Sequence, residues 1–249
     1  MLCDTHCHIF NEYYENIDEI IDNAKLSGIN FIIVNGVDRK SNEEILKLVK
    51  KYDIVYGALG IQPDEVKNMK ADDIDFIRAH INDEKIIAVG EIGLDYHWDG
   101  DRDLQKEIFK KQLDIAIEYN KPVIVHSRDS IQDTYNILKE YNVKGILHCY
   151  SGSVEMAKEF TKIGILLGIG GVLTFKNGVK LVEVVKNIDV NNIVVETDSP
   201  YLSPEPYRGK RNEPKNVKVI YEKICDIKGL NYNELCVAVN SNICRLFDK

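Results

Sequence analysis

Residues that could bind divalent metal ions stand at the ends of several predicted β-strands. They are His6, His8, Glu91, His126, His148 and Asp198, and Gln62 stands at the end of a further predicted strand. Residues two apart in a strand point the same way, so His6 and His8 project into one place. A buried carboxylate is costly unless it is paired or bound to a metal. This pattern predicts a single converging metal centre.

The predicted chemistry of this centre is hydrolysis. Four imidazoles and two carboxylates are enough ligands for two divalent ions, with Glu91 as the bridge because a carboxylate has two oxygens. Such ligands favour Zn, Mn, Fe or Co over Ca, while Mg is possible where a substrate supplies phosphate oxygens. Two ions roughly 3.5–4 Å apart polarise a substrate oxygen and lower the pKa of a shared water. We expect Asp198 to ligate one ion and to accept the proton of the attacking water. The alternative is a polar rim of hydrogen-bonded histidines without metal.

Eight apolar runs rich in Ile and Val predict parallel strands that are buried on both faces. They cover Met1–His6, Asn30–Val37, Val55–Ile61, Lys85–Leu94, Pro122–Ser127, Gly145–Tyr150, Ile165–Gly171 and Ile193–Thr197. Their carboxyl ends carry the candidate ligands, as active sites of (β/α)₈ barrels do. A doubly wound open sheet is the competing fold, but it calls for a Gly-rich turn after the first strand. That strand ends instead in Thr5-His6-Cys7-His8.

Helical patterns separate the strands and complete a (β/α)₈ TIM barrel. Helix starts are expected at Ser41, Ser130 and Ser153, and helix ends at Gly28 and Gly229. An amphipathic stretch at 232–247 predicts an extra C-terminal helix. With no linker or repeat in view, residues 1–249 are expected to form one domain.

Composition is that of an ordinary globular protein, with 44% hydrophobic and 29% charged residues. A net charge of −8 disfavours a protein whose task is nucleic-acid binding without catalysis. The six cysteines form no CxxC pair, which indicates reduced thiols. No signal peptide is recognised, and the longest uncharged stretch, Ile163–Phe175, is too short to cross a bilayer. We therefore expect a cytoplasmic protein with no membrane association and no obligate protein partner.

Several motifs in one order along the chain resemble the TatD family of metal-dependent deoxyribonucleases and related hydrolases, which have an amidohydrolase-type barrel. The motifs are Asp4-Thr5-His6-Cys7-His8, Gly90-Glu91-Ile92-Gly93-Leu94-Asp95-Tyr96, Val125-His126-Ser127-Arg128, His148-Cys149-Tyr150-Ser151-Gly152, Glu196-Thr197-Asp198-Ser199-Pro200-Tyr201-Leu202 and Arg208-Gly209-Lys210-Arg211-Asn212-Glu213-Pro214. The resemblance implies that all six candidate ligands bind metal. It also implies a substrate such as DNA, which many members degrade from the 3′ end, or another ester, such as misacylated tRNA.

One motif departs from the family pattern. Where the family has Gly-x-His-Pro, this chain has Gly60-Ile61-Gln62-Pro63-Asp64. Gln62 can donate a hydrogen bond to a phosphate but cannot become cationic or transfer a proton, and Asp64 adds negative charge nearby. Weaker phosphodiesterase activity or a different substrate is therefore expected.

Further substrate contacts are expected from two arginines and from aromatic residues. Arg208 belongs to a basic loop after the last strand, and Arg128 follows His126 by two residues. Arginine binds phosphate in a bidentate manner. Tyr96 and Trp98, after the fourth strand, could stack on a base. The predicted function is a deoxyribonuclease of the 3′–5′ exonuclease type, and the alternative is an esterase or amidohydrolase acting on a small or aminoacyl ester.

Overall fold

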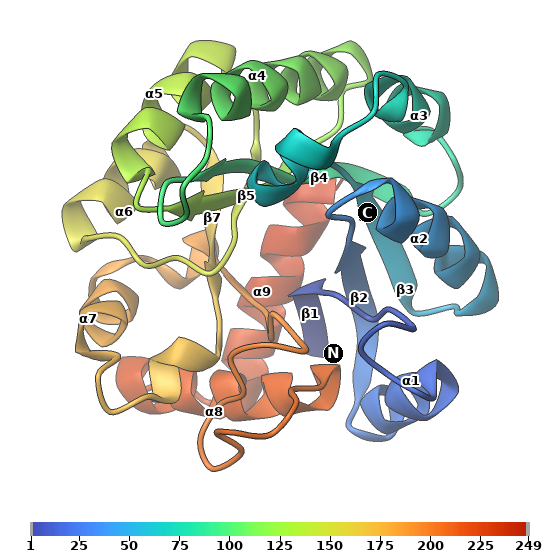
Figure 1. Cartoon of the computed structure of the whole chain (residues 1–249). Helices are drawn as coiled ribbons and strands as arrows, with labels where there is room; N and C mark the ends of the chain where they lie inside the picture. The colour runs from blue at the N-terminus through green and yellow to red at the C-terminus, as the bar shows by residue number, and fades with distance from the viewer. Residues whose placement is uncertain (1, 248–249) are drawn as a thin grey trace.

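Eight parallel strands surrounded by helices form a barrel in the computed structural model, which describes residues 2–247 (Figure 1). The strands pair in sequence order and are β1 Leu2–Cys7, β2 Ile29–Asn35, β3 Val55–Leu59, β4 Ile86–Asp95, β5 Val123–Arg128, β6 Gly145–Leu147, β7 Ile165–Ile169 and β8 Ile193–Val195. The barrel closes between β8 and β1, where Asp198 N donates to His6 O at 2.9 Å and His8 N to Ser199 O at 2.7 Å. The predicted (β/α)₈ fold is confirmed.

Helices alternate with the strands around the outside of the barrel. They are α1 Ile17–Leu26, α2 Arg39–Lys51, α3 Asp73–His80, α4 Arg102–Glu118, α5 Ile131–Tyr141, α6 Val154–Lys162, α7 Val179–Asn187, α8 Val217–Lys228 and α9 Tyr232–Phe247. Short 3₁₀ helices η1 Pro63–Asn68, η2 Gly171–Thr174, η3 Val190–Asn192 and η4 Pro214–Asn216 lie in the connections. Within residues 2–247, no helix is both long and apolar enough to span a membrane.

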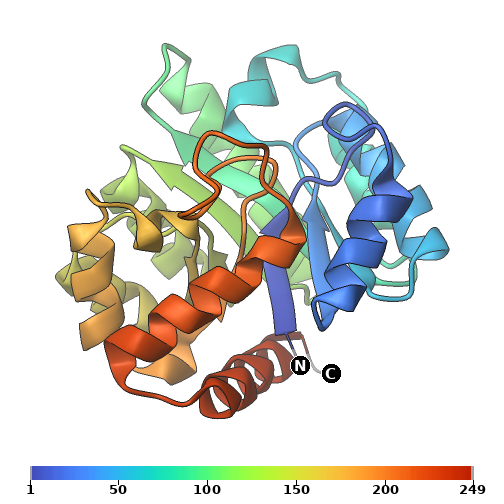
Figure 2. The same ribbon diagram turned by 90° about the horizontal axis from the view of Figure 1, so that it is seen from below.

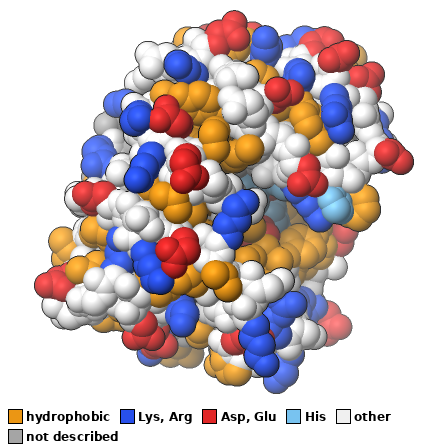
Figure 3. All heavy atoms as spheres, turned by 90° about the vertical axis from the view of Figure 1, so that its left-hand side faces the viewer, with side chains coloured by type: hydrophobic (Ala, Val, Ile, Leu, Met, Phe, Trp, Pro, Cys, Tyr) orange, Lys and Arg blue, Asp and Glu red, His pale blue; other side chains and the backbone are white. Residues whose placement is uncertain are grey.

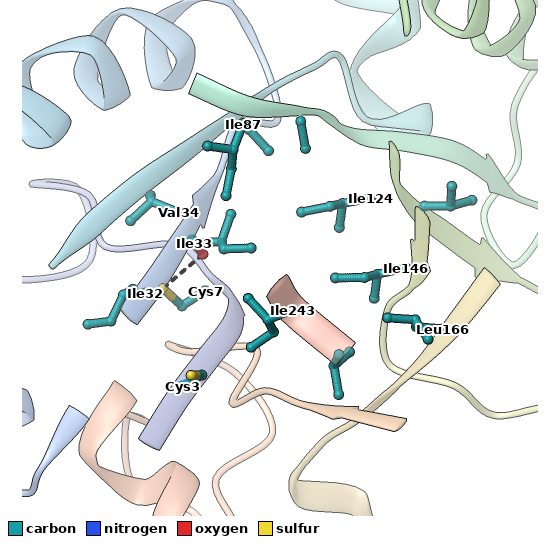
Figure 4. Packing of buried hydrophobic residues seen from close by; sticks show 14 of the residues in the cluster. Cys3, Cys7, Ile32, Ile33, Val34, Ile87, Ile124, Ile146, Leu166 and Ile243 are labelled. Atoms are coloured by element: carbon teal, nitrogen blue, oxygen red, sulfur yellow. Dashed lines mark hydrogen bonds between the residues drawn. The ribbon is translucent and has the colours of Figure 1, made fainter. Parts of the chain in front are cut away.

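The extra helix α9 covers the amino-terminal end of the barrel. Figure 2 shows it lying across the end at which β1 begins. Asn242 Nδ2 on this helix donates to the carbonyl oxygen of Ile193 at 2.8 Å. Ile243 is buried among Ile33, Ile124 and Ile146 from strands on opposite sides of the barrel (Figure 4). Because apolar side chains fill this end of the barrel, we expect a functional site at the opposite end, where the strands have their carboxyl ends. We call this end the mouth.

Some predicted boundaries were wrong by a few residues, for local reasons. The helix start expected at Ser41 lies at Arg39, because Asp38 is the N-cap and Ser41 occupies the third position of a capping box. Ser153 caps α6 as expected. The strands β6 and β8 end before His148 and Asp198, and the backbone then turns through positive φ at Cys149 (46°) and Asp198 (55°). Both ligands thus lie just beyond the regular strand, where the chain enters a turn.

Candidate metal centre

All six predicted ligands meet at the mouth of the barrel. His6, Glu91 and His126 lie in β1, β4 and β5, whereas His8, His148 and Asp198 directly follow β1, β6 and β8 or lie within three residues of them. Their ligand atoms form two groups, His6 with His8 and Asp198, and Glu91 with His126 and His148, and the atoms of each group lie within 4.8 Å of one another. His6 and His148 also form a third such group, with Glu196.

The first group gathers around one oxygen of Glu91. Its Oε2 lies 3.3 Å from His6 Nε2 and 3.5 Å from His8 Nε2. Asp198 Oδ1 lies 3.7 Å from each of these nitrogens. The two nitrogens are 3.2 Å apart. Two nitrogens and two carboxylate oxygens therefore face one small volume.

The second group gathers around the other oxygen of the same carboxylate. Glu91 Oε1 lies 3.0 Å from His126 Nδ1 and 3.0 Å from His148 Nε2, and these nitrogens are 3.0 Å apart. Gln62 Nε2 also donates to this oxygen, at 3.2 Å. Each oxygen of Glu91 thus faces the histidines of one of the two groups.

The donor set fits divalent cations. Glu91 Oε2 is buried and has no hydrogen-bond partner within residues 2–247, although an unpaired buried carboxylate oxygen is costly. Imidazole nitrogens at about 3 Å from one another and from a carboxylate converge as metal ligands do. The two groups could therefore hold two ions, with Glu91 shared between them.

Outer partners orient three of the histidines. His8 Nδ1 donates to the carbonyl oxygen of Asn35 at 2.9 Å, and His126 Nε2 donates to Asp95 Oδ2 at 3.1 Å. His148 Nδ1 faces Glu196 Oε1 at 3.7 Å. Each contact leaves the opposite nitrogen directed at the metal groups, as is usual around metal-binding histidines.

Sequence reasoning missed these orienting groups. Asp95 stands four residues after Glu91, an even spacing that could have placed both on one face of the strand. Glu196 is an acidic residue within the apolar run Ile193–Thr197, and it is fully buried. The Asn35 carbonyl left no sequence signal, because it is a main-chain atom.

The electrostatics of the site follow from burial and from its paired charges. Burial opposes ionisation of Glu91, but the contacts with His148 and His6 outweigh it and lower its pKa well below the usual value. Burial also opposes protonation of His148, yet Glu91 and Glu196 raise its pKa well above 6.5. For Asp198, burial raises the pKa to about 7. Without metal, the centre therefore holds protons, and bound cations would displace them.

A glycine is required where β4 passes β5. Gly93 pairs with His126 in the parallel register and has φ of 142°. A Cβ atom at this position would lie 2.0 Å from the carbonyl oxygen of His126. The second glycine of the Gly90-Glu91-Ile92-Gly93 motif thus allows the strand that carries Glu91 to approach the strand that carries His126.

A pocket of about 410 Å³ opens beside the metal groups and is lined in part by His126, Arg128, His148, Asp198 and Tyr201. Figure 3 shows one side of the molecule, where a histidine lies at the bottom of a recess and basic and acidic side chains are interspersed around it. On this side of the molecule the charged side chains thus form no continuous basic face around the recess.

The three predicted substrate-binding residues differ in their placement. Arg128 lines the pocket, and its guanidinium lies 5.6 Å from the Trp98 ring. Gln62 contacts Glu91 directly. Arg208 is exposed on its loop, with its guanidinium 3.7 Å from the centre of the Phe175 ring. The structure therefore brings Arg128 and Gln62 to the metal groups and leaves Arg208 stacked on an aromatic ring.

The chain is similar to known proteins along nearly its whole length. A family model described as TatD-related DNase matches residues 3–248. The chain is 42% identical to the uncharacterized metal-dependent hydrolase YabD of Bacillus subtilis, over 99% of both chains. It is 32% identical to the uncharacterized metal-dependent hydrolase YcfH of Escherichia coli, over 99% of this chain and 95% of that one. The crystal structure of YJJV, a TatD homologue from Escherichia coli, superposes with a TM-score of 0.94 and 27% identity, covering 100% of this chain and 98% of that one.

Proposed function

We propose that this protein, which belongs to the family of TatD-related DNases, is a divalent-metal-dependent hydrolase that cleaves phosphodiester bonds of DNA from the 3′ end. One observation carries the proposal: each oxygen of the buried Glu91 carboxylate faces a different group of ligands. Relatives named as metal-dependent hydrolases support the same reaction type.

Divalent ions bound by these groups would polarise a phosphoryl oxygen and lower the pKa of an attacking water. The chain's own residues do the rest. Glu91 keeps the two groups of ligands in place relative to each other, because Oε2 contacts His6 and Oε1 contacts His126. Asp198 is 13% exposed, so Oδ1 borders both the first group and the pocket. It accepts the proton of the water as the new oxygen–phosphorus bond forms and the bond from phosphorus to the leaving ester oxygen breaks, and the leaving oxygen then takes up a proton.

Substrate positioning falls to polar groups around the pocket. Arg128 can bind a phosphate next to the scissile one, because its planar guanidinium offers several donors. Gln62 donates to Glu91 Oε1 and holds this carboxylate at the second group. If a cation took this carboxylate oxygen, the same amide would be free to donate to a phosphoryl oxygen. Arg208 is stacked on Phe175 and is not among the residues that line this pocket.

Shortening of labelled DNA tests this proposal. Protein stripped with a chelator and reloaded with Mg²⁺, Mn²⁺, Co²⁺ or Zn²⁺ should shorten a 5′-labelled single strand stepwise from its 3′ end. Asp198→Ala should abolish the reaction, and Asp22→Ala, at an exposed position of α1, should not. Intact DNA with every ion would refute the phosphodiesterase proposal.

A second candidate reaction has one observation in its favour. Gln62, in place of the family histidine, is accompanied by Asp64, whose pKa is raised by burial and by nearby Asp95. This acidic side of the mouth suits an ester with a less charged leaving group, such as an aminoacyl ester. Faster hydrolysis of aminoacyl or small esters than of DNA, lost in Asp198→Ala, would favour this reaction.

A further inference from the structure

Exposed aromatic side chains are concentrated at the mouth. Within the described part of the chain, those with the largest exposure are Trp98 at 59%, Tyr201 at 49% and Tyr207 at 40%. Trp98 lies in the loop after β4, and both tyrosines lie in the loop after β8. Water-exposed rings beside a pocket are typical of surfaces that stack on a ligand.

Tyr201 is the exposed ring that belongs to the pocket of the metal groups. It lines this pocket together with Asp198 and His148. Its ring centre lies 6.2 Å from that of His8, which belongs to the first group of ligands. A flat ligand group on Tyr201 would therefore lie next to the reacting phosphate.

The position of Tyr201 is set by contacts on several sides. Its N–H donates to the carbonyl oxygen of Asp198 at 2.8 Å, and its own carbonyl accepts from Asn212 Nδ2 at 2.8 Å. The Tyr201 hydroxyl donates to the Tyr13 hydroxyl at 3.1 Å, and the two ring centres are 5.9 Å apart. We call Tyr13 and Tyr201 the tyrosine platform. Because it is held before a ligand arrives, little conformational entropy is lost on binding.

Cations stand next to the aromatic surfaces on two sides of the mouth. Arg211 donates to the carbonyl oxygen of Tyr13, and its guanidinium lies 5.0 Å from the Tyr14 ring. Arg128 lies beside Trp98 and lines the same pocket as Tyr201. Aromatic rings alternating with arginines match a chain of flat bases and anionic phosphates, the pattern by which single-stranded nucleic acids are bound.

We propose that the tyrosine platform stacks a base of single-stranded DNA next to the scissile phosphate, with Tyr201 as the ring in contact. The assignment rests on the proposed phosphodiesterase function and makes the base, in addition to the phosphate, a determinant of affinity. A small or aminoacyl ester without such a ring would gain nothing from Tyr201.

The test measures binding separately from cleavage. Fluorescein-labelled oligonucleotides with phosphorothioate linkages at the 3′ end, each with one abasic residue near that end, are titrated with Mn²⁺-loaded protein and followed by anisotropy. An abasic residue at the stacking position should weaken binding to the wild-type protein by roughly 5- to 150-fold, the range measured for base–aromatic stacks. Tyr201→Ala should bind the intact oligonucleotide as weakly as the wild type binds that abasic one, and should not distinguish the two.

Two further variants separate stacking from other effects. Tyr201→Phe keeps the ring and should keep the discrimination. Tyr207→Ala removes an exposed tyrosine from the same loop, outside the pocket, and should behave as wild type. Equal binding of intact and abasic oligonucleotides by the wild type would overturn the stacking proposal even if the protein cleaves DNA. Discrimination lost only in Tyr201→Ala would uphold it even if no cleavage is detected.

Discussion

Replacing Glu91 by glutamine removes a charge from the centre with almost no change in shape. The Glu91 side chain is 1% exposed, and its oxygens lie 3.0–3.5 Å from nitrogens of four histidines. If it bridges two groups of ligands, this one substitution must weaken both. If Glu91 were a ligand of one group alone, Glu91→Gln would leave the other group intact.

The size of the effect follows from the distances. Two unit charges about 4 Å apart at an effective dielectric constant of about 20 interact by about 4 kcal/mol, which is the smallest loss to expect when the ion is divalent. Since about 1.4 kcal/mol corresponds to a factor of ten, Glu91→Gln should lower metal affinity by roughly three powers of ten. At about 1,000 times the dissociation constant, metal stabilises the wild type by about 4.1 kcal/mol. For a chain of 249 residues this raises Tm by roughly 8–16 °C, and in the variant the rise should shrink to roughly 1–2 °C.

The assay is thermal unfolding with and without Mn²⁺ or Zn²⁺, combined with elemental analysis of bound metal after gel filtration. Glu183→Gln, on the exposed side of α7, is the matched control and should keep the full metal-induced shift. A Glu91→Gln protein that retains that shift, or that still carries as much metal as the wild type, would refute the bridging geometry.

Three other outcomes follow from the same contacts. Metal affinity should rise with pH by about tenfold per unit for each displaced proton, because Glu91 and Glu196 raise the pKa of His148 and a ligating imidazole must be neutral. Calorimetry in buffers of different ionisation enthalpy measures the number of protons released. A metal affinity that does not change between pH 6 and 8 would contradict this prediction. Gln62→His should raise phosphodiesterase turnover, since histidine can be cationic beside a phosphate; unchanged rates in a labelled-DNA assay would make Gln62 a bystander. Glu196→Gln should lower metal affinity by roughly 10–100-fold, because the orientation of His148 is weakened. The Tm of the metal-free protein should change little. An equal loss of Tm with and without metal would indicate a purely structural role for Glu196.

Much of the fold and of the candidate centre was predictable from local sequence. The Ile- and Val-rich runs identify the strands, because strands covered on both faces must be apolar throughout. His6, Glu91 and His126 stand near the ends of such runs, and in a barrel these ends converge. The eight-strand order and the meeting of all six side chains therefore follow from residue type and position along the chain.

Distances and partners were decided only by the closed barrel. Which oxygen of Glu91 faces which histidines depends on the register between β4, β5 and the β8–β1 junction, and such contacts join residues far apart in sequence. The positive φ angles at Cys149 and Asp198, next to or at a ligand, also have no signal in the sequence. The Asn35 carbonyl that orients His8 is a main-chain atom, and no residue type marks it. Residue types thus determined which chemistry the chain can perform, while the through-space arrangement of their atoms, set by barrel closure, decided that one carboxylate is shared by two groups of ligands.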